Sequence, residues 1–322
     1  MKLAFIIDPI ATLDPTHDTS VALMEAACRF GHEVWIASMQ SLSIINGKAW
    51  GLLQPVMVHP VKLVDGKWQA PNPWYEAQVG ELQPLENMQV VWMRPDPPVT
   101  TEYLYTTYIL DYVDPQLTLV VNSPTGIRNA NEKIYALQFI DVIPETIVSC
   151  DKAIIRRFVS DKGKAVLKPL GGKGGEGILF LEPGDRNLNS MIEISTNFGK
   201  TPVMVQIYLP EAQAGDKRII LLDGEPIGAV NRIPSSGEFR GNMAAGGSVA
   251  TTEITQREQE ICAQLASTLQ RDGLIFVGID AIGGYLTEVN VTSPTGIREI
   301  DRLHGVNLGD RVIKWLESRV KS

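Results

Sequence analysis

A run of glycines beside a lysine is the first stretch whose residues could do chemistry. The segment KPLGGKGGEGILFLE carries Lys168, Gly172, Gly174, Gly175 and Gly177. Its spacing matches G-x-G-x-x-G, but that motif binds dinucleotides only where a helix follows, and here a second strand-like run follows. It is therefore either an ordinary glycine hairpin or a flap whose N–H groups cover nucleotide phosphates, with Lys168 as the cation. We favour the flap. The sequence has no P-loop motif.

Two carboxylates are predicted to face each other in a second stretch, VGIDAIGGYLTEVNV. With the turn at Gly283-Gly284, Asp280 and Glu288 pair across two antiparallel strands, and alternation puts Asn290 on the face of Glu288. Like charges placed in this way repel each other and need an offsetting partner. A hard cation, Mg²⁺ or Mn²⁺, held by these oxygen-bearing side chains together with phosphate and water would supply it. The alternative is a solvated polar face of a hairpin; we favour the cation site.

A third stretch, IPSSGEFRGNMAAGGSVATT, covers residues 233–252 and is rich in glycine. It is too long for a routine connection, so it is either a lid or a disordered insertion. Guanidinium groups on a closing loop suit phosphate and carboxylate, and Arg232 and Arg240 are available for that purpose. We therefore expect residues 233–249 to be a mobile lid.

Strand and helix patterns alternate over the first third of the chain. LAFIID, the amphipathic TSVALMEAACRFGH and EVWIAS form one βαβ unit, and QVVWMRPDPP and LTLVVNSPTG add strands that end in polar loops. Ligands of open α/β sheets lie beyond the carboxyl ends of the strands, so Asp8, Arg94 and the loop 123–128 should border one crevice. We expect residues 1–129 to form a Rossmann-like α/β domain that binds substrate.

After Glu132 the pattern changes to α+β. Two strands flank the glycine loop, further strands follow at PVMVQIYLPEA and KRIILLDGEPIGAVNRI, and helices are predicted at NEKIYALQF, EITQREQEICAQLASTLQRDG and NLGDRVIKWLESRV. We expect residues 130–205 to be a small lid subdomain with the glycine flap. Residues 206–322 should form a C-terminal subdomain with the metal hairpin and the mobile loop 233–249.

The hexapeptide SPTGIR occurs twice, starting at Ser123 and Ser293, without a repeat around it. The second copy directly follows the acidic hairpin and is expected to be an active-site turn, in which proline fixes φ and glycine reverses the chain. The first should pass the chain to a helix that carries Lys133. We attribute the identity of the copies to similar strand-exit geometry, with Gly126 and Gly296 both at positive φ.

Composition limits the classes of protein to consider. The 322 residues, 44% of them hydrophobic, can bury one large or several modest cores. A net charge of −8 without a basic block argues against a nucleic-acid partner. Cys28, Cys150 and Cys262 lie far apart, which fits neither a disulfide framework nor a zinc site and favours the cytoplasm. The opening apolar run stops at Asp8, too early for a signal peptide, and no stretch approaches a membrane span.

These motifs together resemble those of the ATP-grasp enzymes and, over essentially the whole chain, those of the bacterial glutathione synthetases. The matching segments are MRPDPP, TYILDYVD, TLVVNSP, NEK, VLKPLGGKGGEG, VQIYLPEA, DKR, RIP, RGNMAAGG, GID and LTEVNVTSPTGIREI. The resemblance implies a pre-ATP-grasp domain followed by a two-lobed ATP-grasp fold, in a homo-oligomer, as a tetramer. It implies ATP-dependent ligation of γ-glutamylcysteine and glycine through an acyl phosphate. Another ATP-grasp carboxylate–amine ligase, of the D-alanine or glutamate type, and a non-catalytic ATP-binding protein are the alternatives.

The resemblance also implies roles for individual residues. Those expected to hold ATP are Lys133, Lys168, Gly172, Gly174, Gly175, Gly177, Gln206, Tyr208, Leu209 and Asp216. The expected catalytic residues are Arg218, Arg232 and Arg240, and the expected metal ligands are Asp280, Glu288 and Asn290. Substrate contacts are expected from Asp8, Ser20, Arg94, Ser293, Pro294 and Thr295. The flap departs from the Asp-Gly-Met-Gly-Gly of many relatives, because Gly171 and Lys173 replace the Asp and the Met.

Overall fold

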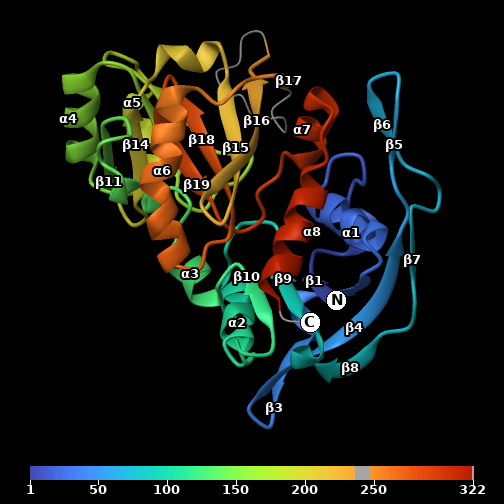
Figure 1. Ribbon diagram of the computed structural model, residues 1–322. Coiled ribbons are helices and arrows are strands. Elements are labelled where there is room, and N and C mark those ends of the chain that lie inside the picture. The colour runs from blue at the N-terminus through green and yellow to red at the C-terminus, as the bar shows by residue number, and fades with distance from the viewer. Residues whose placement is uncertain (236–246, 321–322) are drawn as a thin grey trace.

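The computed structural model describes residues 1–235 and 247–320, which form three large β-sheets and a separate two-stranded hairpin, with helices packed against the sheets (Figure 1). Arg240 and the centre of the predicted lid lie outside the described residues. The ends of that segment are described: Ile233 pairs with Ser248 in neighbouring antiparallel strands.

An eight-stranded sheet occupies the N-terminal part of the chain. Its parallel strands are β1 (Lys2–Ile6), β2 (Glu33–Ala37), β9 (Val90–Met93) and β10 (Leu119–Val121). Its antiparallel edge consists of β3 (Leu42–Ile45), β4 (Lys48–Val58), β7 (Tyr75–Ala77) and β8 (Glu81–Pro84). A separate hairpin, β5 (Lys62–Val64) and β6 (Lys67–Gln69), turns at Asp65-Gly66, both at positive φ. The predicted βαβ unit is confirmed.

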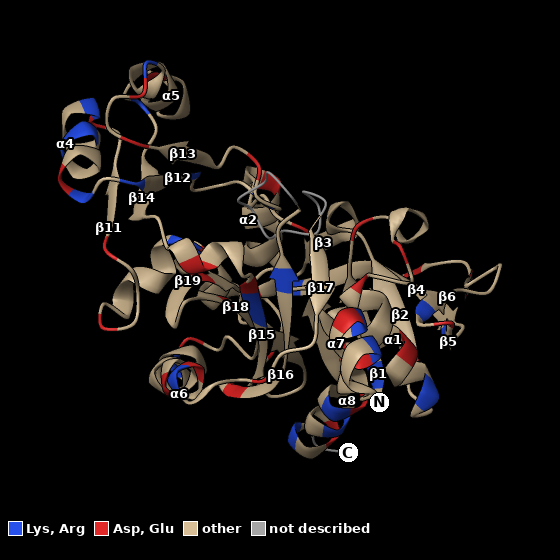
Figure 2. Ribbon diagram, turned by 90° about the horizontal axis from the view of Figure 1, so that it is seen from above, with Lys and Arg blue, Asp and Glu red and all other residues tan. Residues whose placement is uncertain are grey.

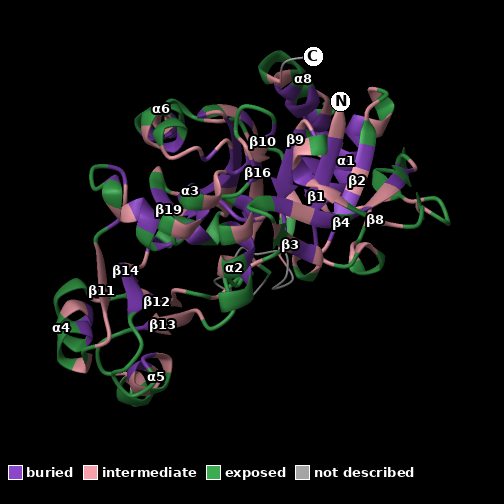
Figure 3. Ribbon diagram, turned by 90° about the horizontal axis from the view of Figure 1, so that it is seen from below, coloured by how far each residue is buried: buried purple, intermediate pink, exposed green. Residues whose placement is uncertain are grey.

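Helices cover both faces of this sheet. On one face α1 (Thr19–Arg29) packs beside α8 (Leu308–Arg319), and apolar residues of both helices share a core with alternate residues of β1. The carboxylate of Asp18 caps α1 by accepting from the N–H of Val21 at 2.9 Å. The opposite face holds α2 (Thr101–Leu110). Figure 3 shows the central strands and α1 largely buried, which makes this part a rigid base for the loops at its strand ends.

A small antiparallel sheet follows, with β11 (Thr146–Ser149), β12 (Ala165–Pro169), β13 (Leu179–Leu181) and β14 (Val203–Ile207). The helices α4 (Lys152–Lys162) and α5 (Leu188–Ser195) cover it. The glycine loop joins β12 to β13, which pair with each other directly. No helix opens at the loop, so the dinucleotide-binding interpretation is excluded.

A third sheet has the strand order β17 (Ser248–Ala250), β16 (Glu225–Ile233), β15 (Asp216–Leu222), β18 (Phe276–Ile282) and β19 (Tyr285–Asn290). The helix α6 (Gln256–Arg271) packs on one face through Ile261, Leu265 and Leu269, and α7 (Ile297–His304) packs on the other. A capping box at Thr255 begins α6. The predicted α/β part followed by α+β parts is confirmed.

The remaining helices are short. They are α3 (Pro124–Asn129) and the 3₁₀ turns η1 (Ile10–Thr12), η2 (Met39–Ser41), η3 (Leu85–Asn87), η4 (Ile134–Gln138) and η5 (Pro210–Gln213). The helix predicted at NEKIYALQF is thus only the 3₁₀ turn η4, which Lys133 precedes.

The two SPTGIR segments have different conformations. Gly296 lies at φ 132°, as predicted, but Gly126 lies inside α3 and not at positive φ, so that prediction was wrong. Gly126 is needed for a close approach instead, since a Cβ there would lie 2.2 Å from the carbonyl oxygen of Asp272. The first copy therefore packs on the turn after α6, where the N–H of Ser123 donates to the carbonyl of Gly273 at 2.9 Å. Neither this copy nor Asp8 lines the cavity described below.

Candidate active site

A cavity of about 570 Å³ lies between the small sheet and the five-stranded sheet. Most of the predicted site residues line it: Lys133, Lys168, Gly172, Gly174, Gly175, Gln206, Tyr208, Leu209, Asp216, Arg218, Arg232, Asp280, Glu288, Asn290, Ser293 and Thr295. Figure 2 shows basic and acidic positions side by side on the five-stranded sheet, near β15 and β18. The cavity is therefore strongly polar on the side of that sheet.

Two lysines reach the cavity from opposite directions. Lys168, on β12, donates to the side-chain oxygen of Gln206 at 2.7 Å, and the amide nitrogen of Gln206 donates to Thr146 at 3.0 Å. Lys133 donates to the carbonyl of Gly172 in the flap at 3.0 Å and pairs with Glu288 at 3.0 Å. Burial lowers the pKa of Lys168, while the carboxylates of Glu288 and Asp216 oppose this shift. An anionic phosphate beside the ammonium group would compensate for its lost hydration and favour its charged form.

The acidic hairpin has the predicted register, in which Asp280 lies opposite Glu288. The side chain of Asn290 lies beside them, its nitrogen 3.3 Å from Asp280. Neighbouring strands supply two arginines that were predicted at the site, but not as partners of Asp280. Arg218 binds Asp280 through Nε at 2.5 Å and Nη2 at 3.0 Å, and Arg232 reaches the same carboxylate at 3.0 Å. The repulsion predicted between the two acids is thus already offset by protein side chains.

Electrostatics keep this cluster charged. Burial opposes the charge on Asp280, but Arg218 and Arg232 outweigh it and hold the pKa of this carboxyl well below its usual range. Burial raises the pKa of Asp216 to about 6, against the attraction of Arg232, with which it pairs at 2.5 Å. Within the described part of the chain, Oδ1 of Asp216 and Nε of Arg232 are buried without a hydrogen-bond partner. Each could receive a ligand group, a hydroxyl at Asp216 and a phosphate at Arg232.

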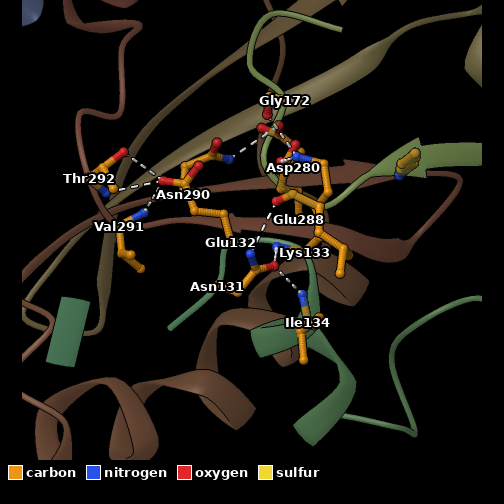
Figure 4. Close-up of polar contacts among 12 residues, drawn as sticks. Asn131, Glu132, Lys133, Ile134, Gly172, Asp280, Glu288, Asn290, Val291 and Thr292 are labelled. Carbon is orange, nitrogen blue, oxygen red and sulfur yellow. Dashed lines mark hydrogen bonds and ion pairs between the residues drawn. The ribbon is translucent and has the colours of Figure 1, made fainter. Parts of the chain in front are cut away.

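Glu132 is a site residue that the sequence reasoning missed. Its carboxylate accepts from the N–H of Val291 at 2.9 Å, and from the N–H and hydroxyl of Thr292 at 3.1 and 2.8 Å (Figure 4). Burial raises the pKa of Glu132, and nearby Glu288 adds to the shift. Glu132 therefore fixes the segment before Lys133 against the end of the acidic hairpin. Its place beside Lys133 in the NEK segment was the signal that could have found it.

Several predicted substrate residues lie behind the cavity wall and do not line it. Arg94 is 3% exposed. Its Nε donates to the hydroxyl of Ser20 at 3.1 Å, and its Nη2 donates to the carbonyl of Pro294 at 3.0 Å. Asp8 accepts from the N–H of Asp96 at 3.0 Å. These residues hold in place the loop of Asp96 and the turn at Ser293–Thr295, and those two segments do line the cavity.

The flap meets the N-terminal part across the cavity. Lys173, one of the two departures in the flap, pairs with Asp96 at 3.2 Å. Gly177 does not line the cavity; it lies at φ 67°, and a Cβ there would lie 2.8 Å from Pro169. Asp96, in the RPDPP segment, was not among the predicted residues although Arg94 beside it was.

Family models match both parts of the chain. The N-terminal domain of prokaryotic glutathione synthetase matches residues 1–128, and the ATP-grasp domain of the same enzyme matches residues 132–305. The chain belongs to the prokaryotic glutathione synthetase family. Among its relatives, the glutathione synthetase of Thermosynechococcus vestitus is 67% identical over 99% of this chain and 100% of its own. That of Gloeobacter violaceus is 51% identical over 98% of this chain and 96% of its own.

Solved structures show the same fold at low identity. D-cycloserine synthetase DcsG superposes with a TM-score of 0.65 at 14% identity, covering 100% of both chains. The ATP-grasp ligase PsnB, complexed with its minimal precursor, Mg and ADP, gives a TM-score of 0.63 at 17% identity, covering 98% of this chain and 97% of its own. The ATP-grasp fold of this glutathione synthetase family member is thereby confirmed. Of the helices described, none has the length and apolar character to cross a membrane.

One further residue of the cavity wall was missed. His17 lies in the loop before α1, lines the cavity, and pairs through Nδ1 with Glu299 of α7. Sequence spacing gave no signal for it, because 282 positions separate the two partners and only the packing of α1 against α7 brings them together.

Proposed function

We propose that the chain joins γ-glutamylcysteine to glycine with ATP, giving glutathione, ADP and phosphate. Family membership supports an ATP-dependent carboxylate–amine ligase. The observation that carries the proposal is the convergence on one cavity of two lysines, the flap, and a pair of carboxylates. Acyl-phosphate chemistry needs such positioning and charge neutralisation and no covalent nucleophile.

ATP would lie along the cavity from the small sheet to the acidic hairpin. The N–H of Ile207 donates to the carbonyl of Glu145, and the N–H of Tyr208 donates to the carbonyl of Lys164. The N–H of Leu209 has no acceptor among the described residues. We assign the adenine edge to the backbone at Leu209, and to Gln206 the role of holding Lys168. The ribose would use the unpartnered oxygen of Asp216, and the phosphates would lie among Lys133, Lys168, Arg232 and the glycine flap.

The acidic hairpin fits a divalent cation. The described residues contain no cluster of three or more His, Cys, Asp or Glu, so an all-protein cage is not formed there. Two carboxylates and the amide oxygen of Asn290, completed by phosphate and water, match the way proteins hold Mg²⁺. Such an ion, Mg²⁺ or Mn²⁺, held by Asp280, Glu288 and Asn290, would neutralise charge on the transferred phosphoryl group.

The chain's own residues would then carry out the reaction in order. The C-terminal carboxylate of γ-glutamylcysteine attacks the γ-phosphate while Lys133, Lys168 and Arg232 stabilise the spreading charge. The turn at Ser293–Thr295, held by Arg94, orients the peptide. The amine of glycine then displaces phosphate from the acyl carbon. Arg240, which lies outside the described residues, and Arg218, which fixes Asp280, remain catalytic candidates.

The decisive experiment is ADP release with Mg²⁺ and each substrate separately and together, with D-alanine and glutamate as alternative acceptors. We expect rapid release only when γ-glutamylcysteine and glycine are both present. Turnover that ignores either one would refute the proposal. Cys28, Cys150 and Cys262 are free thiols, which supports a cytoplasmic reaction. The family resemblance favours a homotetramer, and light scattering after size-exclusion chromatography would test that.

A further inference from the structure

The incoming amine needs a proton acceptor, and the phosphate-binding residues cannot provide one. Lys133, Arg218 and Arg232 are held in ion pairs with the two hairpin carboxylates, so neither these cations nor those carboxylates are free to accept a proton. Glycine enters as an ammonium ion, so its nitrogen must lose a proton before it can attack. A base would therefore have to come from the cavity wall beyond the acidic hairpin.

The wall beyond the hairpin is formed by the turn at Ser293–Thr295 and by the N-terminal loops that carry His17 and Asp96. The turn follows Asn290 after two residues, so this end of the cavity adjoins the position of the transferred phosphoryl group. The acyl phosphate and the attacking amine must therefore meet here. Of the side chains lining this end, the imidazole of His17 is the group best suited to exchange a proton near neutral pH.

His17 is held in one orientation. Its N–H at Nδ1 donates to Glu299, which is 5% exposed and lies in the first turn of α7. The loop itself is docked on that turn, because Nε of Arg298 donates to the carbonyl of Pro15 at 3.1 Å and the N–H of Ile297 donates to Thr19 at 3.4 Å. No described residue pairs with Nε2, and the His17 side chain is 45% exposed beside the cavity.

We propose that His17, oriented by Glu299, is the general base for the glycine amine, an inference that rests on the proposed function. Nε2 of neutral His17 takes one proton from the ammonium group. The nitrogen lone pair forms the C–N bond, the bond from the acyl carbon to the phosphate oxygen breaks, and phosphate leaves with that electron pair. The second nitrogen proton passes to the departing phosphate. Glu299 stabilises the imidazolium that forms, as a buried carboxylate does for other catalytic histidines.

The charged neighbours of His17 suit this role. The hydrogen bond with Glu299 raises the pKa of His17, burial opposes the shift, and the charges of Glu299, Asp14 and Asp18 add to it. A raised pKa increases the proton affinity of the imidazole, on which a general base depends.

The test separates proton transfer from positioning by changing the acceptor. His17→Asn can still donate to Glu299 but has no atom in place of Nε2. Hydroxylamine, largely unprotonated at neutral pH, can attack the acyl phosphate without a base. We expect kcat/KM for glycine to fall about 100-fold in His17→Asn, while the hydroxylamine reaction stays within about threefold of wild type. His59, a half-buried histidine that pairs with Glu76 and does not line the cavity, supplies the matched control, and His59→Asn should leave both reactions unchanged.

Equal losses with glycine and hydroxylamine, or no loss with glycine, would overturn the proposal. A second variant adds a pH readout. Glu299→Gln keeps a hydrogen-bond acceptor but removes the charge, so the acidic limb of the kcat/KM profile for glycine should move to lower pH. An unmoved limb would also count against His17. If wild-type protein fails to release ADP with both substrates, the proposed function fails instead, and the two failures are thereby distinguished.

Discussion

Glu288 makes the clearest demand on a single side chain, because its carboxylate lies opposite Asp280 and also pairs with Lys133 at 3.0 Å. Glu288→Gln keeps the volume and removes the charge. We expect turnover to fall about 100-fold or more, since the charge that organises Lys133 and a bound cation is lost. Steady-state ADP release at saturating Mg²⁺ measures this, with Glu193→Gln, at a half-buried carboxylate that pairs with Lys152, as control. Near wild-type turnover would contradict the assignment of the hairpin.

The same variant tests a stability expectation that the structure revises. From sequence alone, removing the repulsion with Asp280 should slightly raise the stability of the free protein. In the structure each acid already has a cationic partner. We therefore expect no gain, and a loss in the free energy of unfolding of about 1 kcal/mol or less. Urea denaturation of the two proteins without ligand measures the difference.

At this scale the sequence predicted what local spacing determines. The Gly-Gly turn determined the pairing of Asp280 with Glu288 by symmetry. The sequence could not reveal that Arg218 lies opposite Asp280. That pairing depends on how β15 packs beside β18, and the two residues are 62 positions apart in the sequence. His17 and Glu299 are the extreme case of the same limit.

The glycine flap offers a prediction about an element. Gly177 has a left-handed backbone conformation, and the Cβ added in Gly177→Ala would lie 2.8 Å from Pro169. We expect the flap to shift and KM for ATP to rise about tenfold, equivalent to roughly 1.4 kcal/mol of strain. Gly171→Ala is the control, because its Cβ would have no neighbour within 4 Å and its φ is not positive. Equal KM values in the two variants would show that the flap does not depend on this conformation.

Most elements could be predicted from the sequence, because their periodicity is local. The strands flanking the glycine loop and the helix α6 follow directly from apolar alternation and capping. The error at Gly126 has a tertiary cause: glycine there accommodates the backbone of Asp272, which lies 146 positions away in the sequence. A glycine in the sequence does not indicate whether a positive φ or a close approach of neighbouring backbone requires it.

At the scale of the whole molecule, Gly126 is a contact point between its N-terminal and ATP-grasp parts. Gly126→Ala would place a Cβ 2.2 Å from the carbonyl oxygen of Asp272. Backbone must move to relieve that overlap, so we expect a loss of about 2–4 kcal/mol in the free energy of unfolding. Urea denaturation measures it, with Gly80→Ala, whose nearest contact would be 3.4 Å, as control. A loss as small as that of the control would contradict the close approach.

The pH dependence of stability also belongs to this scale. Burial raises the pKa of Asp301 to about 7, against the hydrogen bond from Leu308. In the unfolded chain the pKa is about 4, so from pH 4 to 7 only the folded state keeps the proton and the free energy of unfolding falls as pH rises, by at most about 4 kcal/mol. Asp301→Asn should abolish this slope and be the more stable protein at pH 8. A difference from wild type that is constant between pH 4 and 8 would contradict this.

The packing of α8 on α1 has a consequence for how the protein is made. Residues 19–29 are translated long before the partners that cover their apolar face, among them Val312 and Leu316. Folding during translation therefore cannot complete the core that α1 forms with the first sheet, because this core stays uncovered while the ATP-grasp part is synthesised. Chains interrupted before residue 308 would lack this cover, so we expect a translational pause before that point to leave the apolar face of α1 exposed to chaperones.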